Sequence, residues 1–200
     1  MSIEKLEPYR IILASKSPRR SALLKELGLT FELDAEDGVD ETFPSGLMGR
    51  DIAEYLAILK SDAYSNTLKK NDILITADTV VWFKDHLLGK PRDEAHAREI
   101  LRELSGNTHQ VYTGVCLRSA NKKKAFVSGT SVRFAKLSDG EINHYILKYK
   151  PYDKAGAYGI QEWIGYIAVE EIQGSYFNVM GLPVQKVYKE LLKFTESDQA

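Results

Sequence analysis

Residues 11–28, IILASKSPRRSALLKELG, decide the fold of this chain. An apolar run leads into a short polar turn and then into a helix-forming segment, which is the pattern of a buried strand followed by a helix. Ser17 is a good N-cap, Pro18 suits the first helical position, and Gly28 suits a left-handed residue after the helix. The sequence therefore predicts a helix that begins at Pro18 and ends just before Gly28.

The start of this helix predicts an anion site. Its first turn offers unpaired N–H groups and the positive end of the helix dipole. The polar side chains around it make phosphate the anion that fits best; they are Ser15, Ser17, Arg19 and Arg20. Arg20 also lies in line with the leucines of the apolar face, where a guanidinium needs an anionic partner, either a ligand or a structural carboxylate. A capped surface helix with solvated arginines is the alternative.

The composition is that of a globular protein with a substantial core, in one large domain or two small lobes. The chain has 200 residues, of which 44% are hydrophobic and 28% charged. A net charge of -1 gives no general affinity for nucleic acid. The single cysteine, Cys116, excludes an intramolecular disulfide. Without a signal peptide or a membrane-length apolar run, we expect a cytoplasmic protein with no membrane partner.

Strand and helix patterns alternate along the rest of the chain, which predicts a mixed α/β fold. Hydrophobic periodicity predicts helices over residues 51–65, 93–104, 138–149 and 184–194. Strands are predicted over residues 30–33, 72–83, 109–117, 125–137 and 164–172. The glycine-rich stretch 153–163 is predicted to lie outside the core, and the tail 195–200 to be frayed.

Charged residues at four places outside the first helix are candidates for chemistry. Asp78 follows a buried apolar run, and a carboxylate there is costly unless it is paired, metal-bound or used in a reaction. Lys60 lies at the edge of an apolar helix stripe, where it either snorkels to solvent or points into a cleft. Lys90, in Gly-Lys-Pro, reads by default as a solvated turn residue. In the acidic loop 34–46, Glu41 or Asp40 is a candidate ligand for a divalent cation, unless all of its carboxylates face solvent.

These residues together favour the hydrolysis of a phosphate ester or phosphoanhydride in a nucleotide. Cations at a helix N-terminus suit a polyphosphate, and carboxylates suit magnesium or the deprotonation of a water. No P-loop, nucleophile elbow or zinc-protease motif is present in the sequence.

Six segments, in order, resemble the Maf family of nucleoside triphosphate pyrophosphatases. They are ASKSPRR, TADTVV, LGKP, YTGV, DKAGAYGIQ and GSYFNVMGLP. The resemblance implies a single domain over residues 1–200, with a mixed central sheet, flanking helices and a cleft between two lobes, similar to the inosine triphosphate pyrophosphatases. It also implies cleavage between the α and β phosphates with Mg²⁺ or Mn²⁺, a small-molecule nucleotide as ligand with no nucleic acid, and a homodimer.

The resemblance also implies a role for each matched position. Asp78 looks like the proton acceptor that activates the attacking water, and Thr79 takes its place among the residues that choose the base. The specificity set is Arg19, Thr79 and Gln161; the phosphate-binding set is Ser15, Arg20, Lys60 and Lys90; and the metal set is Glu41 and Asp78.

Within the family, SPRR together with DKAGAYGIQ resembles the branch that acts on dTTP and UTP. One departure is Glu162-Trp163 after GIQ, where a glycine often follows, and it bears on the shape of the base pocket. The alternatives are a pyrophosphatase that prefers 7-methyl-GTP, a phosphatase that releases orthophosphate, and a nucleotide-binding regulator linked to septum formation. Asp78 as base, metal ligand or both also stays open.

Overall fold

A mixed seven-stranded sheet forms the centre of the protein. The computed structural model describes residues 3–196. Across the sheet the strands run β2 (Phe31–Leu33), β1 (Arg10–Leu13), β3 (Asp72–Phe83), β5 (Thr108–Arg118), β6 (Lys123–Phe134) and β7 (Val169–Gln173), with β4 (His86–Leu88) paired to β3. β1 is parallel to β2 and β3, and the remaining pairs are antiparallel. The predicted mixed α/β class is confirmed.

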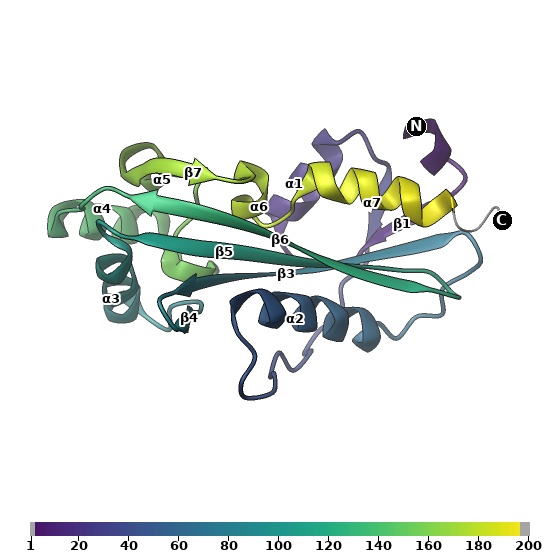
Figure 1. Cartoon of the computed structure of the whole chain (residues 1–200), viewed down its shortest axis with the longest axis horizontal. Helices are drawn as coiled ribbons and strands as arrows, with labels where there is room; N and C mark the ends of the chain where they lie inside the picture. The colour runs from purple at the N-terminus through teal and green to yellow at the C-terminus, as the bar shows by residue number, and fades with distance from the viewer. Residues whose placement is uncertain (1–2, 197–200) are drawn as a thin grey trace.

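Helices cover both faces of this sheet. α2 (Gly49–Ala63) lies on one face, and α1, α6 and α7 lie on the other (Figure 1). The bounds of those three are Pro18–Glu26, Tyr176–Met180 and Val184–Glu196. α3, α4 and α5 gather at the far end of the long strands, at Glu94–Leu104, Asp139–Tyr149 and Trp163–Ala168. Two short 3₁₀ helices complete the described chain, at Ile3–Leu6 and Ala155–Ala157.

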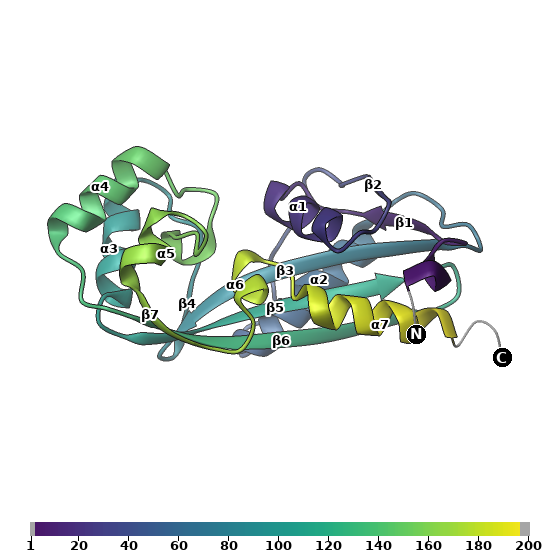
Figure 2. The same ribbon diagram turned by 90° about the horizontal axis from the view of Figure 1, so that it is seen from above.

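The apolar core is divided between two lobes. One cluster packs α1 and α7 on the sheet, and includes Leu24 and Leu191. Another packs α3, α4 and the glycine-rich segment at the opposite end, and includes Leu104 and Ile146. Figure 2 shows these helix groups at opposite ends of the molecule, with β3, β5 and β6 running beneath both. The predicted two-lobed architecture is therefore confirmed.

The segment that opens the chain folds as its sequence predicts. The Ser17 hydroxyl accepts a hydrogen bond from the Arg20 N–H at 3.5 Å, and Pro18 is the first helical residue. Gly28 has φ of 81°, a left-handed conformation that suits glycine after a helix. Local capping chemistry thus fixes where the anion site begins.

Residues 164–172 correct the prediction of one continuous strand. Residues Trp163–Ala168 form helix α5, and only Val169–Gln173 form a strand. Ile164 and Ala168 are both buried, and their spacing of four residues places them on one face of a helix.

The glycine-rich stretch is part of the core, which is also contrary to the prediction. Gly156 has φ of 69°, and a β-carbon built on it would lie 2.9 Å from a methyl carbon of Val81. The absence of a side chain therefore lets the backbone press against β3, with Ala157, Tyr158 and Ile160 buried around it.

Three smaller corrections concern boundaries. α2 is offset from the predicted 51–65, beginning at Gly49 and ending at Ala63. Thr195 and Glu196 belong to α7, whereas the rest of the predicted frayed tail lies outside the described residues. Asp78 lies in the middle of β3 and not near the end of a buried strand, because the strand continues to Phe83.

None of the helices within residues 3–196 has the length and apolar character needed to cross a membrane.

Candidate active site

A cleft of about 430 Å³ opens beside the middle of β3. On one side of this strand, the pairing with β1 ends at Ile75 and the pairing with β4 begins at Val81. Within the described chain, residues 76–80 therefore have no partner strand on that side. Side chains on both faces of β3 can reach the cleft here, which explains how Asp78 and Thr79, although adjacent, both line it.

The structure brings together nine of the residues that the sequence assigned to the site, and Ser17 with them, whereas Asp40, the alternative to Glu41 as a metal ligand, does not line the cleft. The nine that line the cleft are Ser15, Arg19, Arg20, Glu41, Lys60, Asp78, Thr79, Lys90 and Gln161. They come from both lobes and from α2, so they are far apart in sequence. Their assembly in one cleft agrees with the predicted site, although it does not test the individual roles.

The lining of the cleft carries an excess of positive charge. Six cationic side chains line it, namely Lys16, Arg19, Arg20, Lys60, Lys90 and Lys154. Four carboxylates oppose them, namely Glu36, Glu41, Asp78 and Asp153. Because the whole chain has a net charge of -1, this local excess is a property of the cleft and favours an anionic ligand.

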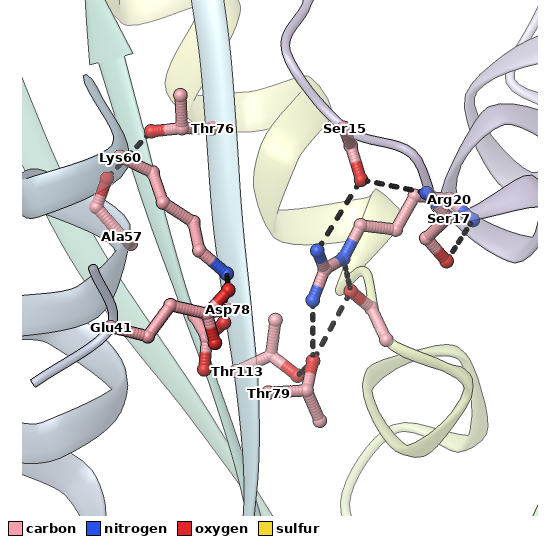
Figure 3. A network of polar contacts seen from close by, with 11 residues as sticks. Ser15, Ser17, Arg20, Glu41, Ala57, Lys60, Thr76, Asp78, Thr79 and Thr113 are labelled. Carbon is pink, nitrogen blue, oxygen red and sulfur yellow. Dashed lines mark hydrogen bonds and ion pairs between the residues drawn. The ribbon is translucent and has the colours of Figure 1, made fainter. Parts of the chain in front are cut away.

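Lys60 is held between two carboxylates on the α2 side of β3. Its Nζ lies 2.5 Å from Asp78 Oδ1 and 2.9 Å from Glu41 Oε1 (Figure 3). Burial would raise the pKa of Glu41, but the hydrogen bond and charge of Lys60 outweigh it and lower that pKa. The ammonium therefore points into the cleft, which excludes the alternative that Lys60 snorkels to bulk solvent.

Arg20 approaches β3 from the opposite side, as Figure 3 shows. Its guanidinium donates hydrogen bonds to Gly181 O at 2.8 Å, Thr79 Oγ1 at 3.1 Å and Ser15 Oγ at 3.4 Å. Burial lowers the pKa of this guanidinium, and the charge of Asp78 offsets only part of that effect. Among the described residues, no carboxylate lies within ion-pair distance of Arg20, so its charge calls for an external anion.

The lobe that contains α3, α4 and α5, here called the far lobe, contributes the glycine-rich segment to the cleft. Arg19 Nη1 donates to Asp153 Oδ2 at 2.8 Å, which joins α1 to the glycine-rich segment across the cleft. The Gln161 amide is nearby, and its Oε1 is buried without a hydrogen-bond partner in the described structure. The lining of the cleft also includes apolar and aromatic side chains, among them Val111, Val179 and Tyr158. Such a pocket suits a flat heterocycle that can donate a hydrogen bond to the amide.

The residues present suit a divalent cation only in part. Across residues 3–196, no group of three or more His, Cys, Asp or Glu side chains lies close enough to hold a metal. Glu41 and Asp78, however, both contact the Lys60 ammonium, which shows that their oxygens converge on one cation. Mg²⁺ is usually bound through one or two carboxylates and the substrate phosphates, so this pair fits a metal that enters with a nucleotide.

Several residues of the site were missed by sequence reasoning because their contacts are long-range. Thr113 Oγ1 lies 2.9 Å from Thr79 Oγ1, and it donates to Asn178 O at 3.0 Å. The buried Asn178 side chain in turn donates to Val111 O, which fixes α6 and hence the Gly181 carbonyl that Arg20 uses. In the sequence, the one local sign of these contacts is a polar residue, Asn178, in the short apolar segment that ends at Gly181.

Curated proteins resemble this chain over nearly its whole length. A curated protein of Phocaeicola vulgatus named dTTP/UTP pyrophosphatase is 54% identical over 96% of this chain and 99% of its own. Proteins of the same name from Parabacteroides distasonis and Porphyromonas gingivalis are 51% and 48% identical, over 96% and 98% of this chain and 100% of their own. The solved structure of the Staphylococcus aureus Ham1 protein covers 63% of this chain and 72% of that one, with 18% identity and a TM-score of 0.46.

The model of one protein family, described as "Maf-like protein", matches residues 10–194. That span includes both lobes and all nine residues of the cleft. The chain therefore belongs to the Maf-like protein family.

Proposed function

We propose that this chain hydrolyses nucleoside triphosphates, dTTP and UTP foremost, to the nucleoside monophosphate and pyrophosphate. The observation that carries the proposal is the pairing of two features in one cleft. Arg20 presents a cation without a carboxylate partner in the described structure, and Asp78 presents a carboxylate on the other side of the same strand. Relatives about half identical to this chain are named for this activity.

The triphosphate would lie between α1 and α2. Ser15, Arg20 and the first turn of α1 offer hydrogen bonds and positive charge from one side. Lys60 and Lys90 offer ammonium groups from the other. A chain of phosphates spanning these groups would place its α-phosphate near Asp78.

The attack on the α-phosphate needs a water and a base that accepts its proton. The water oxygen attacks the α-phosphorus, the bond from that phosphorus to the bridging oxygen breaks, and pyrophosphate leaves with the electron pair. Asp78 takes the proton of the water. Lys60 contacts Oδ1 of this carboxylate, which leaves Oδ2 available to the water.

Glu41 and Asp78 are the residues that would hold Mg²⁺ or Mn²⁺. Such an ion would neutralise charge on the phosphates and make the water more acidic. Asp78 is a poorer base while it holds a cation. Its roles as general base and as metal ligand are therefore alternatives. The ion pairs of Lys60 with Glu41 and Asp78 would have to break, one or both of them, for such an ion to bind.

Gln161 would read the base. Thymine and uracil share an N–H group that lies between two carbonyls, and the unpartnered Oε1 of Gln161 can accept from such a group. Arg19 and Thr79 complete the specificity set from the other lobe and from β3.

Product analysis with magnesium tests the proposal. The purified chain is given dTTP, UTP, CTP, GTP and 7-methyl-GTP in turn, and monophosphate, pyrophosphate and orthophosphate are measured separately. We expect monophosphate and pyrophosphate, fastest from dTTP and UTP, and no turnover in EDTA. The same products led by 7-methyl-GTP would discard the base assignment, orthophosphate would indicate stepwise phosphate removal, and binding without product would indicate a regulator.

The setting of the activity is part of the proposal. The whole chain is treated as one domain that acts on a small nucleotide and has no nucleic-acid or membrane partner. A cytoplasmic location fits this substrate class and the buried, unpaired thiol of Cys116. A homodimer is expected, and sedimentation analysis checks it.

A further inference from the structure

A chain of charged and polar contacts runs along one wall of the cleft, from α1 to α4. We define the wall network by its members, Arg19, Asp153, Lys154, Glu162 and Tyr145. We propose that Glu162 is a positioning residue of this network, which directs the amide of Gln161 and thereby sets the preference for the base. The inference rests on the proposed nucleotide hydrolysis, because it concerns the same site.

Glu162 makes two contacts that hold its carboxylate in place. Oε2 accepts a hydrogen bond from the Tyr145 hydroxyl, and Oε1 lies 3.2 Å from Lys154 Nζ. The same Tyr145 hydroxyl accepts from the Gly159 N–H at 3.0 Å. The loop that carries Gln161 is thus tied to α4 on one side and to Lys154 on the other.

The network continues from Lys154 to the opposite lobe. Lys154 Nζ lies 2.7 Å from Asp153 Oδ1, and Asp153 Oδ2 accepts from Arg19 at 2.8 Å. Burial would raise the pKa of Asp153, but Lys154 and Arg19 outweigh it and hold that pKa at about 2. Charges therefore alternate along the wall, and each cation lies against a carboxylate. Of the two groups proposed to choose the base, Arg19 is one end of this network, and Gln161 precedes its member Glu162 in the chain.

Gly159 is the point at which Glu162 acts on Gln161. A β-carbon built on Gly159 would lie 2.9 Å from Gln161 Nε2 and 2.9 Å from Glu162 Cδ. Both side chains therefore pack on the same bare α-carbon. The Gln161 Oε1 has no partner in the described structure, so packing and not hydrogen bonding holds this amide in its direction. A displaced Glu162 carboxylate would let the amide turn.

Two variants test this role. Glu162→Gln keeps the shape and an acceptor for Tyr145, but it removes the charge that faces Lys154. Gly159→Ala keeps every charge of the network but inserts a methyl group 2.9 Å from both the Gln161 amide and the Glu162 carboxyl carbon, so it displaces the packing that joins the two side chains. We expect the preference for dTTP and UTP over CTP and GTP, measured as the ratio of kcat/KM values, to fall roughly tenfold in each variant. The change should lie in KM, with kcat for dTTP within about threefold of wild type.

A matched control separates positioning from mere stability. Glu170→Gln removes a carboxylate of the edge strand β7 that pairs with Arg133 on β6 and does not line the cleft, and it should leave the base preference unchanged. A lowered melting temperature of Glu162→Gln with an unchanged preference would overturn the proposal, since that is the signature of a structural role. An unchanged preference in Gly159→Ala would do the same.

The wild-type assay keeps this inference apart from the proposed function. If the wild type hydrolyses none of the nucleotides, the proposed function fails, and calorimetric binding of the same nucleotides replaces turnover. A binding preference that is present in wild type and lost in Glu162→Gln would still support the positioning role. A wild type that binds no nucleotide would overturn both.

Discussion

Asp78 and Thr79 show how two adjacent residues serve opposite sides of one cleft. Successive side chains of a strand point to opposite faces, so Asp78 meets Lys60 from α2 and Thr79 meets Arg20 from α1. Both can reach the cleft because, within the described chain, β3 has no partner strand on one of its two sides at these residues, although β5 pairs with them on the other. The position of a gap in the sheet, and not only the identity of the residues, makes this pair usable.

Replacing Asp78 by asparagine should separate turnover from binding. We expect kcat to fall on the order of 10²- to 10⁴-fold, because an amide cannot take the proton of the water. Nucleotide affinity should change by less than about tenfold, since the phosphate-binding cations remain. Pyrophosphate release and calorimetry measure the two quantities. Asp62→Asn is the control, because Asp62 on α2 pairs with Lys123 away from the cleft. Turnover near the wild-type rate would remove Asp78 from the reaction.

His109 predicts how stability changes with pH. It is buried behind Tyr158, with Nε2 2.7 Å from the Tyr158 hydroxyl, and burial lowers its pKa from 6.5 to about 4. Between these pH values, His109 therefore binds a proton in the unfolded chain but stays neutral in the folded chain. We expect the free energy of unfolding to fall by about 3 kcal/mol as the pH drops from 6.5 to 4, on top of other groups.

The His109→Phe variant isolates this contribution. Phenylalanine fits among the neighbouring rings of Phe134 and Tyr158 but cannot titrate. Urea denaturation at several pH values should give a shallower slope between pH 4 and 6.5 for the variant than for the wild type. Parallel slopes would show that His109 does not take up the proton.

At the scale of elements, the contact of α2 with β5 depends on Gly114. A β-carbon built on Gly114 would fall well inside contact distance of the Ala53 carbonyl oxygen, which belongs to helix backbone and cannot easily yield. Gly114→Ala should therefore lower the free energy of unfolding by about 2 kcal/mol or more. Nothing lies within 4 Å of a β-carbon built on Gly89, so Gly89→Ala is the control in the same urea experiment. Equal free energies of unfolding for the two variants would mean that α2 can move away from β5 at little cost and so relieve the clash.

Elements defined by local chemistry could be predicted from the sequence. Ser17 and Ser138 cap their helices as expected, and Ser138 forms a full capping box with Glu141. Helix α5 was missed because its apolar residues also fit a strand. The burial of the glycine-rich stretch was missed because it depends on Val81, distant in sequence.

The candidate site divides in the same way. Arg20 stood out because it interrupts an apolar face, and Asp78 because it interrupts a buried strand. Gln161 was found only through resemblance to a family, since nothing local marks it. The contacts of Glu162 with Tyr145 and Lys154 could not be predicted, because they join an inter-helix loop to α4 through a fold that had to be known first.

At the scale of the whole molecule, the two lobes should unfold together. β3, β5 and β6 each contribute side chains to the core clusters of both lobes, so neither cluster can form without strands that the other stabilises. We expect a single urea transition with coincident midpoints by circular dichroism and by tryptophan fluorescence. Trp82→Phe leaves Trp163 as the reporter in the lobe of α3 and α4, and Trp163→Phe leaves Trp82 as the reporter beside α2. Midpoints that differ between these probes would contradict a single cooperative unit.

The same three strands have a consequence for what can enter the cleft. They pass under both lobes without a break, so the lobes are joined by hydrogen-bonded ladders and not by a flexible connection. Widening the opening would require the sheet itself to bend. We therefore expect the opening of the cleft to keep a fixed width, which is set by the stiffness of the sheet and limits the size of the molecules that enter. A variant that accepts bulkier molecules should be sought by shortening the loops along the rim of the cleft, since in residues 3–196 continuous strand ladders join the two lobes.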